Sequence, residues 1–384
     1  RELLLLDLNA ETRAYIHSRW IETANELPVK ERVAHFRELL LLDLNAETRA
    51  YVYSRWIETA NELPVKGRVD HFRELLAHEL NSETQGNVHN RWIETADGLS
   101  SPEERIEHYR ELLTLPLDTE TRAYVYSRWI ETANELPVKG RVDHFRELLA
   151  HELNSETQGN VYNRWIETAD GLSSPKERIE HYRELLTLPL DTERRAALHN
   201  RWMEALLQLA SPEQRQQQFT ALLAAKLSPE TRSAMIHHKA EFETAQVNPV
   251  AFPELLGLAE NSEDRKQVAA FWVEALEKLK SSKQQTEGYR SLAENPVVVR
   301  KPELAPTREY ALARLAELQA ASGALGRFPA LLAETKDSQT RRYIAGTWLS
   351  KVESHEDAEL RKREYQKMLS QSGPDFRELR STAL

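Results

Sequence analysis

Histidine is the residue type with the widest chemical use in this chain, which has 13 histidines and no cysteine among its 384 residues. A ladder of imidazoles at regular spacing could bind metal ions or pass protons. Packed helices stand about 8–10 Å apart, whereas zinc–nitrogen bonds are about 2.0–2.1 Å long, so histidines in successive copies cannot share one zinc ion. The pattern therefore favours a structural or surface role for the five histidines that precede a recurring aromatic residue, which are His35, His71, His108, His144 and His181.

Other chemical motifs are incomplete. The segments beginning at His237 and His355 resemble pieces of metal-binding helices but lack the further ligands that such sites need. Without cysteine there is no thiolate ligand or thiol nucleophile, and no phosphate-binding glycine loop, G-x-S-x-G elbow or kinase signature occurs. The sequence therefore predicts no catalytic residue, no metal and no cofactor, and a protein that is not an enzyme.

Charged residues flank a recurring tryptophan. Arginine precedes the tryptophan, and glutamate follows two residues after it. This pattern could form a charged stripe that grips a polar partner, or a ladder of ion pairs between adjacent repeats, which we favour. The arginines are Arg19, Arg55, Arg91, Arg128, Arg164 and Arg201, and the glutamates are Glu22, Glu58, Glu94, Glu131, Glu167 and Glu204.

The elements that position these residues are tandem repeats of 36 or 37 residues. The RELL element marks repeat starts at 1, 37, 73, 110, 146 and 183, and weaker copies start near 220, 253, 290 and 329. All eight tryptophans stand nineteen residues after a repeat start, and the two copies without tryptophan have Lys239 and Glu309 there. Residues 37–72 nearly match 110–145, and 73–109 nearly match 146–182, so the duplicated unit comprises two repeats.

Each repeat predicts a helical hairpin. In residues 47–63, Val52, Trp56 and Ala60 share one face at the helical period, with Asn45 as N-cap. A single hairpin cannot cover its apolar face, but stacked hairpins bury a continuous core. We expect an all-α fold, an α-α superhelix (solenoid) of about ten helical hairpins. Residues 1–219 would be near-identical repeats, residues 220–365 divergent repeats, and residues 366–384 a cap or linker.

Composition limits the partners. The formal net charge of −10 would repel a nucleic-acid backbone on average. The longest apolar runs lie inside amphipathic helices, so neither a membrane span nor a signal peptide is expected. The sequence leaves the oligomeric state open and predicts a soluble protein, in the cytoplasm or secreted into a host cell.

The chain resembles the tetratricopeptide class of helix-pair repeats over residues 1 to about 365. The likeness is one of architecture, because the W-x₂-L-G-x₂-Y signature is absent and Trp is followed by Ile-Glu-Thr-Ala in five copies. The resemblance implies a groove that binds a protein or peptide. Near-identical copies without cysteine are also similar to repeat-bearing effectors that bacterial pathogens secrete.

Residues that recur in every copy are those that stacking requires, so binding is expected where copies differ. A variable position five residues before Trp lies off the apolar stripe, and tyrosine or asparagine occupies it in five successive repeats. This alternation favours a binding surface, or it is an unselected relic of the two-repeat duplication. With the adjacent arginines, the predicted partner-binding residues are Tyr51, Arg55, Asn87, Arg91, Tyr124, Arg128, Asn160 and Arg164. The leading hypothesis is a non-catalytic scaffold for a protein or peptide. The alternatives are a modular nucleic-acid-binding array and an assembly spacer.

Overall fold

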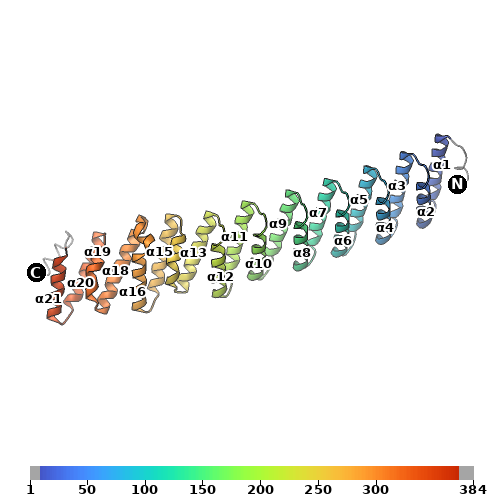
Figure 1. Cartoon of the computed structure of the whole chain (residues 1–384). Coiled ribbons are helices and arrows are strands. Elements are labelled where there is room, and N and C mark those ends of the chain that lie inside the picture. Colours follow the sequence, from blue (N-terminus) through green and yellow to red (C-terminus); the bar gives the residue numbers. More distant parts are fainter. Residues whose placement is uncertain (1–8, 372–384) are drawn as a thin grey trace. The chain divides into compact units, whose positions relative to one another are not determined.

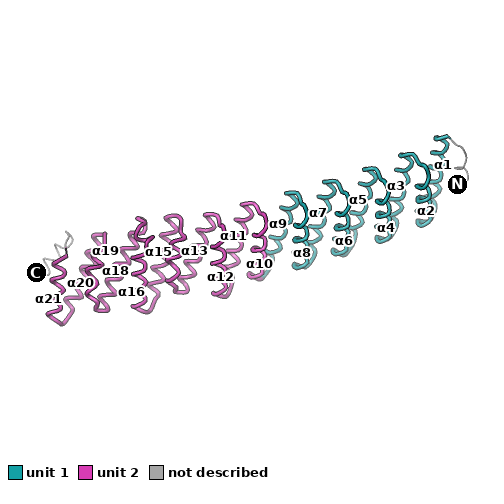
Figure 2. The backbone as a smooth tube through the Cα atoms, viewed as in Figure 1, with its two compact units in different colours: residues 1–173 teal, residues 174–384 magenta. Residues whose placement is uncertain are grey.

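The computed structural model describes residues 9–371 of the chain, and these residues form helices and no strand. The chain divides into two compact units, residues 1–173 and residues 174–384 (Figure 2). The first expected repeat start, at residue 1, and most of the expected cap at 366–384 lie outside the described residues.

Unit 1 is a stack of helix pairs in which each pair is joined by a short turn (Figure 1). Its helices are α1 (Ala10–Ala24), α2 (Val29–Leu40), α3 (Ala46–Ala60), α4 (Val65–Leu76), α5 (Ser82–Asp97), α6 (Pro102–Leu113), α7 (Thr119–Ala133), α8 (Val138–Leu149) and α9 (Ser155–Asp170).

Unit 2 continues the pattern with two modifications, since short 3-10 turns precede three of its helices and an extra short helix, α17, is inserted. Its elements are α10 (Pro175–Leu185), α11 (Thr192–Leu207), α12 (Pro212–Leu223), α13 (Pro229–Ala245), η2 (Pro249–Ala251), α14 (Phe252–Leu258), α15 (Ser262–Glu277), α16 (Ser282–Glu294), α17 (Pro296–Arg300), η3 (Pro302–Leu304), α18 (Ala305–Ser322), η4 (Leu325–Arg327), α19 (Phe328–Glu334), α20 (Ser338–Glu353) and α21 (Ala358–Ser370). The predicted all-α solenoid of helical hairpins is confirmed.

Capping residues fix where the helices begin. The side chains of Asn45, Asn81 and Asp118 accept hydrogen bonds from the backbone N–H groups three residues later. Ser101 does the same before Pro102, which occupies the first helical position. These bonds satisfy backbone donors that the first helical turn leaves without partners, and the N-caps predicted from the sequence are confirmed.

The tryptophan column forms the core between repeats in unit 1. Trp56 and Trp129 are fully buried, and the guanidinium of the preceding RELL arginine lies over each ring. Each of three such arginines also makes two hydrogen bonds to the glutamate of the next RELL element, which adds a charge-assisted link between repeats. The arginine–glutamate pairs are Arg37–Glu74, Arg73–Glu111 and Arg110–Glu147, with N–O distances of 2.5–2.7 Å.

The sequence analysis favoured ion pairs between adjacent repeats for the arginines directly before tryptophan, and that expectation is wrong. Arg55, Arg91 and Arg164 form ion pairs with the glutamate three residues later in the same helix. Residues three apart share one helix face, so each arginine binds the glutamate of its own helix and not one in the next repeat. Arg128 alone among the four makes a further ion pair with the preceding repeat, at 3.0 Å from Asp97.

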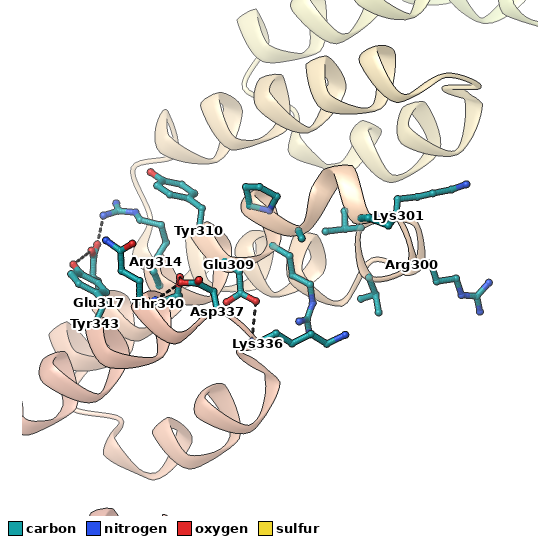
Figure 3. A pocket seen from close by; sticks show the side chains of 18 residues that line it. Arg300, Lys301, Glu309, Tyr310, Arg314, Glu317, Lys336, Asp337, Thr340 and Tyr343 are labelled. Atoms are coloured by element: carbon teal, nitrogen blue, oxygen red, sulfur yellow. Dashed lines mark hydrogen bonds and ion pairs between the residues drawn. The ribbon is translucent and has the colours of Figure 1, made fainter. Parts of the chain in front are cut away.

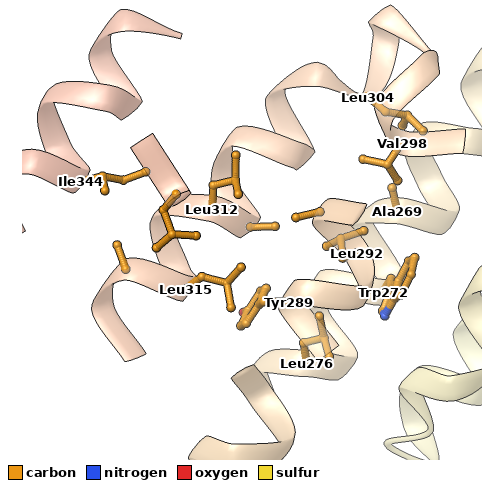
Figure 4. Close-up of a cluster of buried hydrophobic side chains, with 14 of the residues drawn as sticks. Ala269, Trp272, Leu276, Tyr289, Leu292, Val298, Leu304, Leu312, Leu315 and Ile344 are labelled. Carbon is orange, nitrogen blue, oxygen red and sulfur yellow. The ribbon is translucent and has the colours of Figure 1, made fainter. Parts of the chain in front are cut away.

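Unit 2 contains its own duplication, with a spacing of 76 residues. Phe252 and Phe328 each begin a short helix, and their rings stack on Trp272 and Trp348, which are also 76 residues apart. In this register Lys239 corresponds to Leu315, which is buried in the core shown in Figure 4. The sequence-based assignment of Glu309 to the tryptophan column is therefore corrected, because the insertion at α17 and η3 shifts the count.

Val247 adopts the left-handed backbone conformation at the end of α13, with φ of 52°. It is the only non-glycine residue with positive φ in residues 9–371, and its counterpart 76 residues later is Gly323, with φ of 75°. In both places the next residue donates a backbone hydrogen bond to the helix, from Asn248 to Glu243 and from Ala324 to Gln319. The two turns therefore have the same backbone hydrogen bond, but only the second has glycine, the residue that adopts a positive φ at little cost.

We expect Val247→Gly to stabilise unit 2 by about 1 kcal/mol, because a β-branched side chain in this region costs roughly 1–2 kcal/mol and glycine in the unfolded chain offsets part of the gain. Urea-induced unfolding followed by circular dichroism measures the change. Val247→Ala serves as the control, since it keeps the Cβ and most of the strain. Destabilisation by the glycine variant would mean that the valine side chain contributes more by packing than its backbone costs.

Candidate binding surfaces

The histidines before the aromatic column contact the core tryptophans. The indole N–H groups of Trp20, Trp56 and Trp92 donate to the Nδ1 atoms of His35, His71 and His108, at 3.2, 3.4 and 3.4 Å. Gln218 replaces histidine in α12 and accepts from Trp202 at 3.1 Å. Accepting from an indole requires a neutral imidazole nitrogen. These contacts support the structural role predicted for the column.

Burial lowers the pKa of several histidines below their ordinary value. Desolvation is the largest cause for each, and the nearby carboxylates oppose it at His71 and His108. Burial is also the largest cause at His17, His89 and His199, whose side chains are almost fully covered. The histidines whose pKa is lowered are His17, His71, His89, His108, His144 and His199.

The chain should therefore lose stability as the pH falls below about 6.5, the ordinary pKa of histidine. A base whose folded-state pKa is lowered takes up a proton more readily when unfolded, so its stabilising contribution is complete above the unfolded pKa and is lost below it. Melting temperatures measured between about pH 7.5 and pH 5 test this sign. A His71→Gln/His108→Gln/His144→Gln variant should show a shallower pH dependence, since glutamine does not titrate and can accept the indole bonds that His71 and His108 accept. An unchanged slope in that variant would assign the effect to other groups.

The predicted binding residues lie on the first helices of unit 1. Tyr51, Asn87, Tyr124 and Asn160 are all exposed, and each lies one helical turn from its arginine on the same helix face. Helix α3 contacts α5, and α7 contacts α9. The eight residues therefore form two equivalent patches. Patch 1 comprises Tyr51, Arg55, Asn87 and Arg91, and patch 2 comprises Tyr124, Arg128, Asn160 and Arg164.

Within each patch, one arginine is held by side chains of the preceding repeat and the other is half exposed. Arg55 and Arg128 are partly buried and reach side chains of the preceding repeat, Asn25 and Asp97. Arg91 and Arg164 are half exposed. Arg164 also lines a polar hollow of about 330 Å³ with Glu131, Asn134, Arg141, Glu167 and Thr168. The alternation of held and half-exposed arginines follows the two-repeat duplication.

Unit 2 contains a larger groove that the sequence reasoning missed. Its volume is about 1100 Å³, and α17, η3, α18 and the start of α20 supply its lining (Figure 3). Five cationic and three acidic residues line it, together with the rings of Tyr310 and Tyr343. One sequence signal was present, because the repeat starts at 290 and 329 are farther apart than 36 or 37 residues.

Hydrogen bonds fix the two tyrosine side chains that line the groove. Tyr310 donates to Glu277 at 2.5 Å and Tyr343 donates to Glu317. Burial and Glu277 raise the pKa of Tyr310, and the hydrogen bond to Glu317 raises that of Tyr343, so both hydroxyls stay protonated donors. The rings remain 41% and 50% exposed. They are thus held in place while presenting apolar surface to solvent.

No helix in residues 9–371 is long and apolar enough to span a lipid bilayer.

Comparison with known proteins yields structural likeness only. No protein-family model and no curated protein matches the chain. Similar solved structures include the TPR domain of P58(IPK), with 11% identity over 92% of this chain and 99% of that one and a TM-score of 0.22. The Cnd3–Cnd2 condensin subcomplex of S. pombe has 13% identity, coverage of 95% and 62%, and a TM-score of 0.27. The TPR2AB–pHSP90 complex of yeast Sti1 has 16% identity, coverage of 73% and 99%, and a TM-score of 0.20.

These scores lend no support to any particular function. What the chain shares with the tetratricopeptide class is the tandem arrangement of helix pairs, and the resemblance expected from the sequence is confirmed at that level.

Proposed function

We propose that the chain is a non-catalytic scaffold that binds a protein or peptide through patches 1 and 2 on the first helices of unit 1. The observation that carries the proposal is the difference in burial between the tryptophans and the tyrosines of these helices. The tryptophans of these helices are buried beneath arginines, whereas Tyr51 and Tyr124 on the same helices are 45% and 50% exposed. Exposed tyrosine beside arginine is a combination enriched among the residues that dominate protein interfaces.

The fold makes no use of the exposed tyrosine hydroxyls, which leaves them available to a partner. Within the described part of the chain, neither the Tyr51 nor the Tyr124 hydroxyl has a hydrogen-bond partner. Because the two patches are equivalent, a partner that carries one motif twice would gain affinity by engaging both. We therefore expect binding with two equivalent contacts per chain.

The test starts from peptides selected on the full chain from a displayed library and then measured singly by isothermal titration calorimetry. The Tyr51→Ala/Tyr124→Ala variant should weaken binding by roughly tenfold, since truncating an interface anchor commonly costs more than 1 kcal/mol. Each single variant should weaken one of the two sites by a similar factor and leave the other unchanged. Leu41→Ala is the matched control, because Leu41 is 85% exposed in the turn after α2 and belongs to neither patch.

Other outcomes decide between the proposal and its alternatives. Equal loss in the Leu41→Ala control would contradict binding at the patches. Salt-dependent binding to single-stranded RNA, with no peptide selected, would favour the nucleic-acid array. A chain that binds neither would act as an assembly spacer. Residues 9–371 add no feature that favours a secreted effector, so the proposal concerns binding alone.

A further inference from the structure

We propose that the groove of unit 2 is a second binding site, and that it takes an extended peptide in which acidic and apolar side chains alternate. This inference goes beyond the function proposed for unit 1, since it concerns different helices and a defined ligand chemistry. It depends on three features of the groove, which are its unpaired cations, its fixed tyrosine rings and its absence from the duplicated copy.

Three cationic side chains that line the groove form no ion pair in the described part of the chain. Arg300, Lys301 and Lys336 are exposed, and among residues 9–371 none of them has a carboxylate within salt-bridge distance. Figure 3 shows Arg300 and Lys301 projecting from the end of the groove opposite the two tyrosines. In a chain of net charge −10, a local excess of unpaired positive charge favours an acidic ligand.

The acidic side chains of the groove are already engaged. Glu309 accepts the backbone N–H of Lys336 at 3.0 Å, and Asp337 caps α20 by accepting from Thr340 at 2.7 Å. Glu317 pairs with Arg314 and accepts from Tyr343. Each of these carboxylates thus has a hydrogen-bond donor within the fold, and with five cationic and three acidic residues the lining of the groove carries a net positive charge.

Two tyrosine rings that line the groove are fixed in position. The rings of Tyr310 and Tyr343 are anchored by their hydroxyl bonds, so little conformational entropy is lost when a ligand packs on them. Val299 is also exposed, and Pro302 and Pro306 contribute further apolar lining. The volume of about 1100 Å³ is large enough to hold several side chains of a peptide segment.

The duplicated copy in unit 2 lacks these features. The residues that correspond to Tyr310, Lys336 and Tyr343 in the register of 76 residues are Ala234, Glu260 and Gln267. The insertion that supplies Arg300 and Lys301 precedes α18 but has no counterpart before α13. The two copies share the fold and differ at the groove, so stacking does not require the groove residues.

This comparison also supplies the test. Tyr310→Ala/Lys336→Glu/Tyr343→Gln places the residues of one copy in the other, where the fold accepts them. The probe is an acetylated, fluorescent peptide in which Glu alternates with Leu and Phe, and its binding to the full chain is measured by anisotropy. We expect the copy-swap variant to bind roughly tenfold more weakly or worse, because it removes two anchors and reverses one charge. Lys280→Glu, exposed in the same unit outside the groove, should bind as the unchanged chain does.

Further probes settle the ligand chemistry and the location. The proposal is overturned if the peptide with Gln in place of Glu binds as tightly, if the copy-swap variant binds unchanged, or if single-stranded DNA binds more tightly than the acidic peptide. Tyr51→Ala/Tyr124→Ala should leave acidic-peptide binding unchanged. If this variant lost acidic-peptide binding, the acidic peptide would bind to unit 1 and not to the groove. If no peptide partner were found for unit 1, the assignment of the groove would still stand.

Discussion

Replacing Glu243 with alanine should destabilise unit 2 by about 3–5 kcal/mol, the usual cost of leaving one member of a buried ion pair without its partner. Glu243 is 1% exposed and Lys239 is 6% exposed, and their charged atoms are 3.1 Å apart. Lys239 also donates to Gln216 at 3.2 Å, and Asn248 donates to Glu243 at 2.7 Å. Removing the carboxylate therefore leaves an ammonium group buried with one neutral acceptor.

The chain itself suggests how to remove the pair without that cost. In the counterpart helix α18, Leu315 and Gln319 occupy the positions of Lys239 and Glu243, and both are buried. Lys239→Leu/Glu243→Gln should therefore be neutral or stabilising by about 1–4 kcal/mol, as found when well-packed residues replace buried ion pairs. Lys239→Leu alone should be strongly destabilising, because it leaves the Glu243 carboxylate buried with only its amide partner.

Hydrogen exchange of the α13 amides is the appropriate readout, because helical repeat arrays need not unfold in one step. Urea-induced unfolding of the full chain gives the accompanying free energy. A loss smaller than about 1 kcal/mol for Glu243→Ala would mean that water or a rearranged side chain compensates Lys239, and that the pair is not buried in solution.

The fold could be predicted because stacking imposes local rules at fixed spacing. The N-caps Asn45, Asn81 and Asp118 and the buried Trp56 and Trp129 follow from period and residue type alone. The partners of charged residues were harder to predict. An arginine such as Arg91 can reach a glutamate in its own helix or in the next, and only side-chain geometry decides between them.

The duplication in unit 2 and its groove were missed for a related reason. Counting from the RELL element works while repeat length is constant, but the insertion before α18 placed Glu309 where Leu315 belongs. The groove lining comes from several elements around that insertion, so no local pattern in the sequence brings Lys301, Lys336 and Tyr343 together. In patches 1 and 2, by contrast, each helix supplies two residues one turn apart, so spacing within the helix is enough to predict them.

Trp56→Ala and Trp129→Ala should each destabilise unit 1 by about 3–5 kcal/mol, the usual cost of truncating a buried tryptophan. Both rings are fully buried, and each has an arginine over it, from Arg37 at 5.7 Å and from Arg110 at 5.4 Å. Their repeats are near-identical, so the two substitutions are replicates within one molecule. Chemical unfolding and exchange of α3 and α7 amides should give matching losses.

The double variant tests how far each repeat senses its neighbours. The two tryptophans lie two helix pairs apart and share no contact partner among those described, so the separate losses should add within about 0.3–0.5 kcal/mol. Nearest-neighbour stacking predicts this result, because each repeat contacts only the adjacent ones. A double loss well below the sum would show that the first substitution already unfolds the helices around the second, and that unit 1 behaves as one cooperative block.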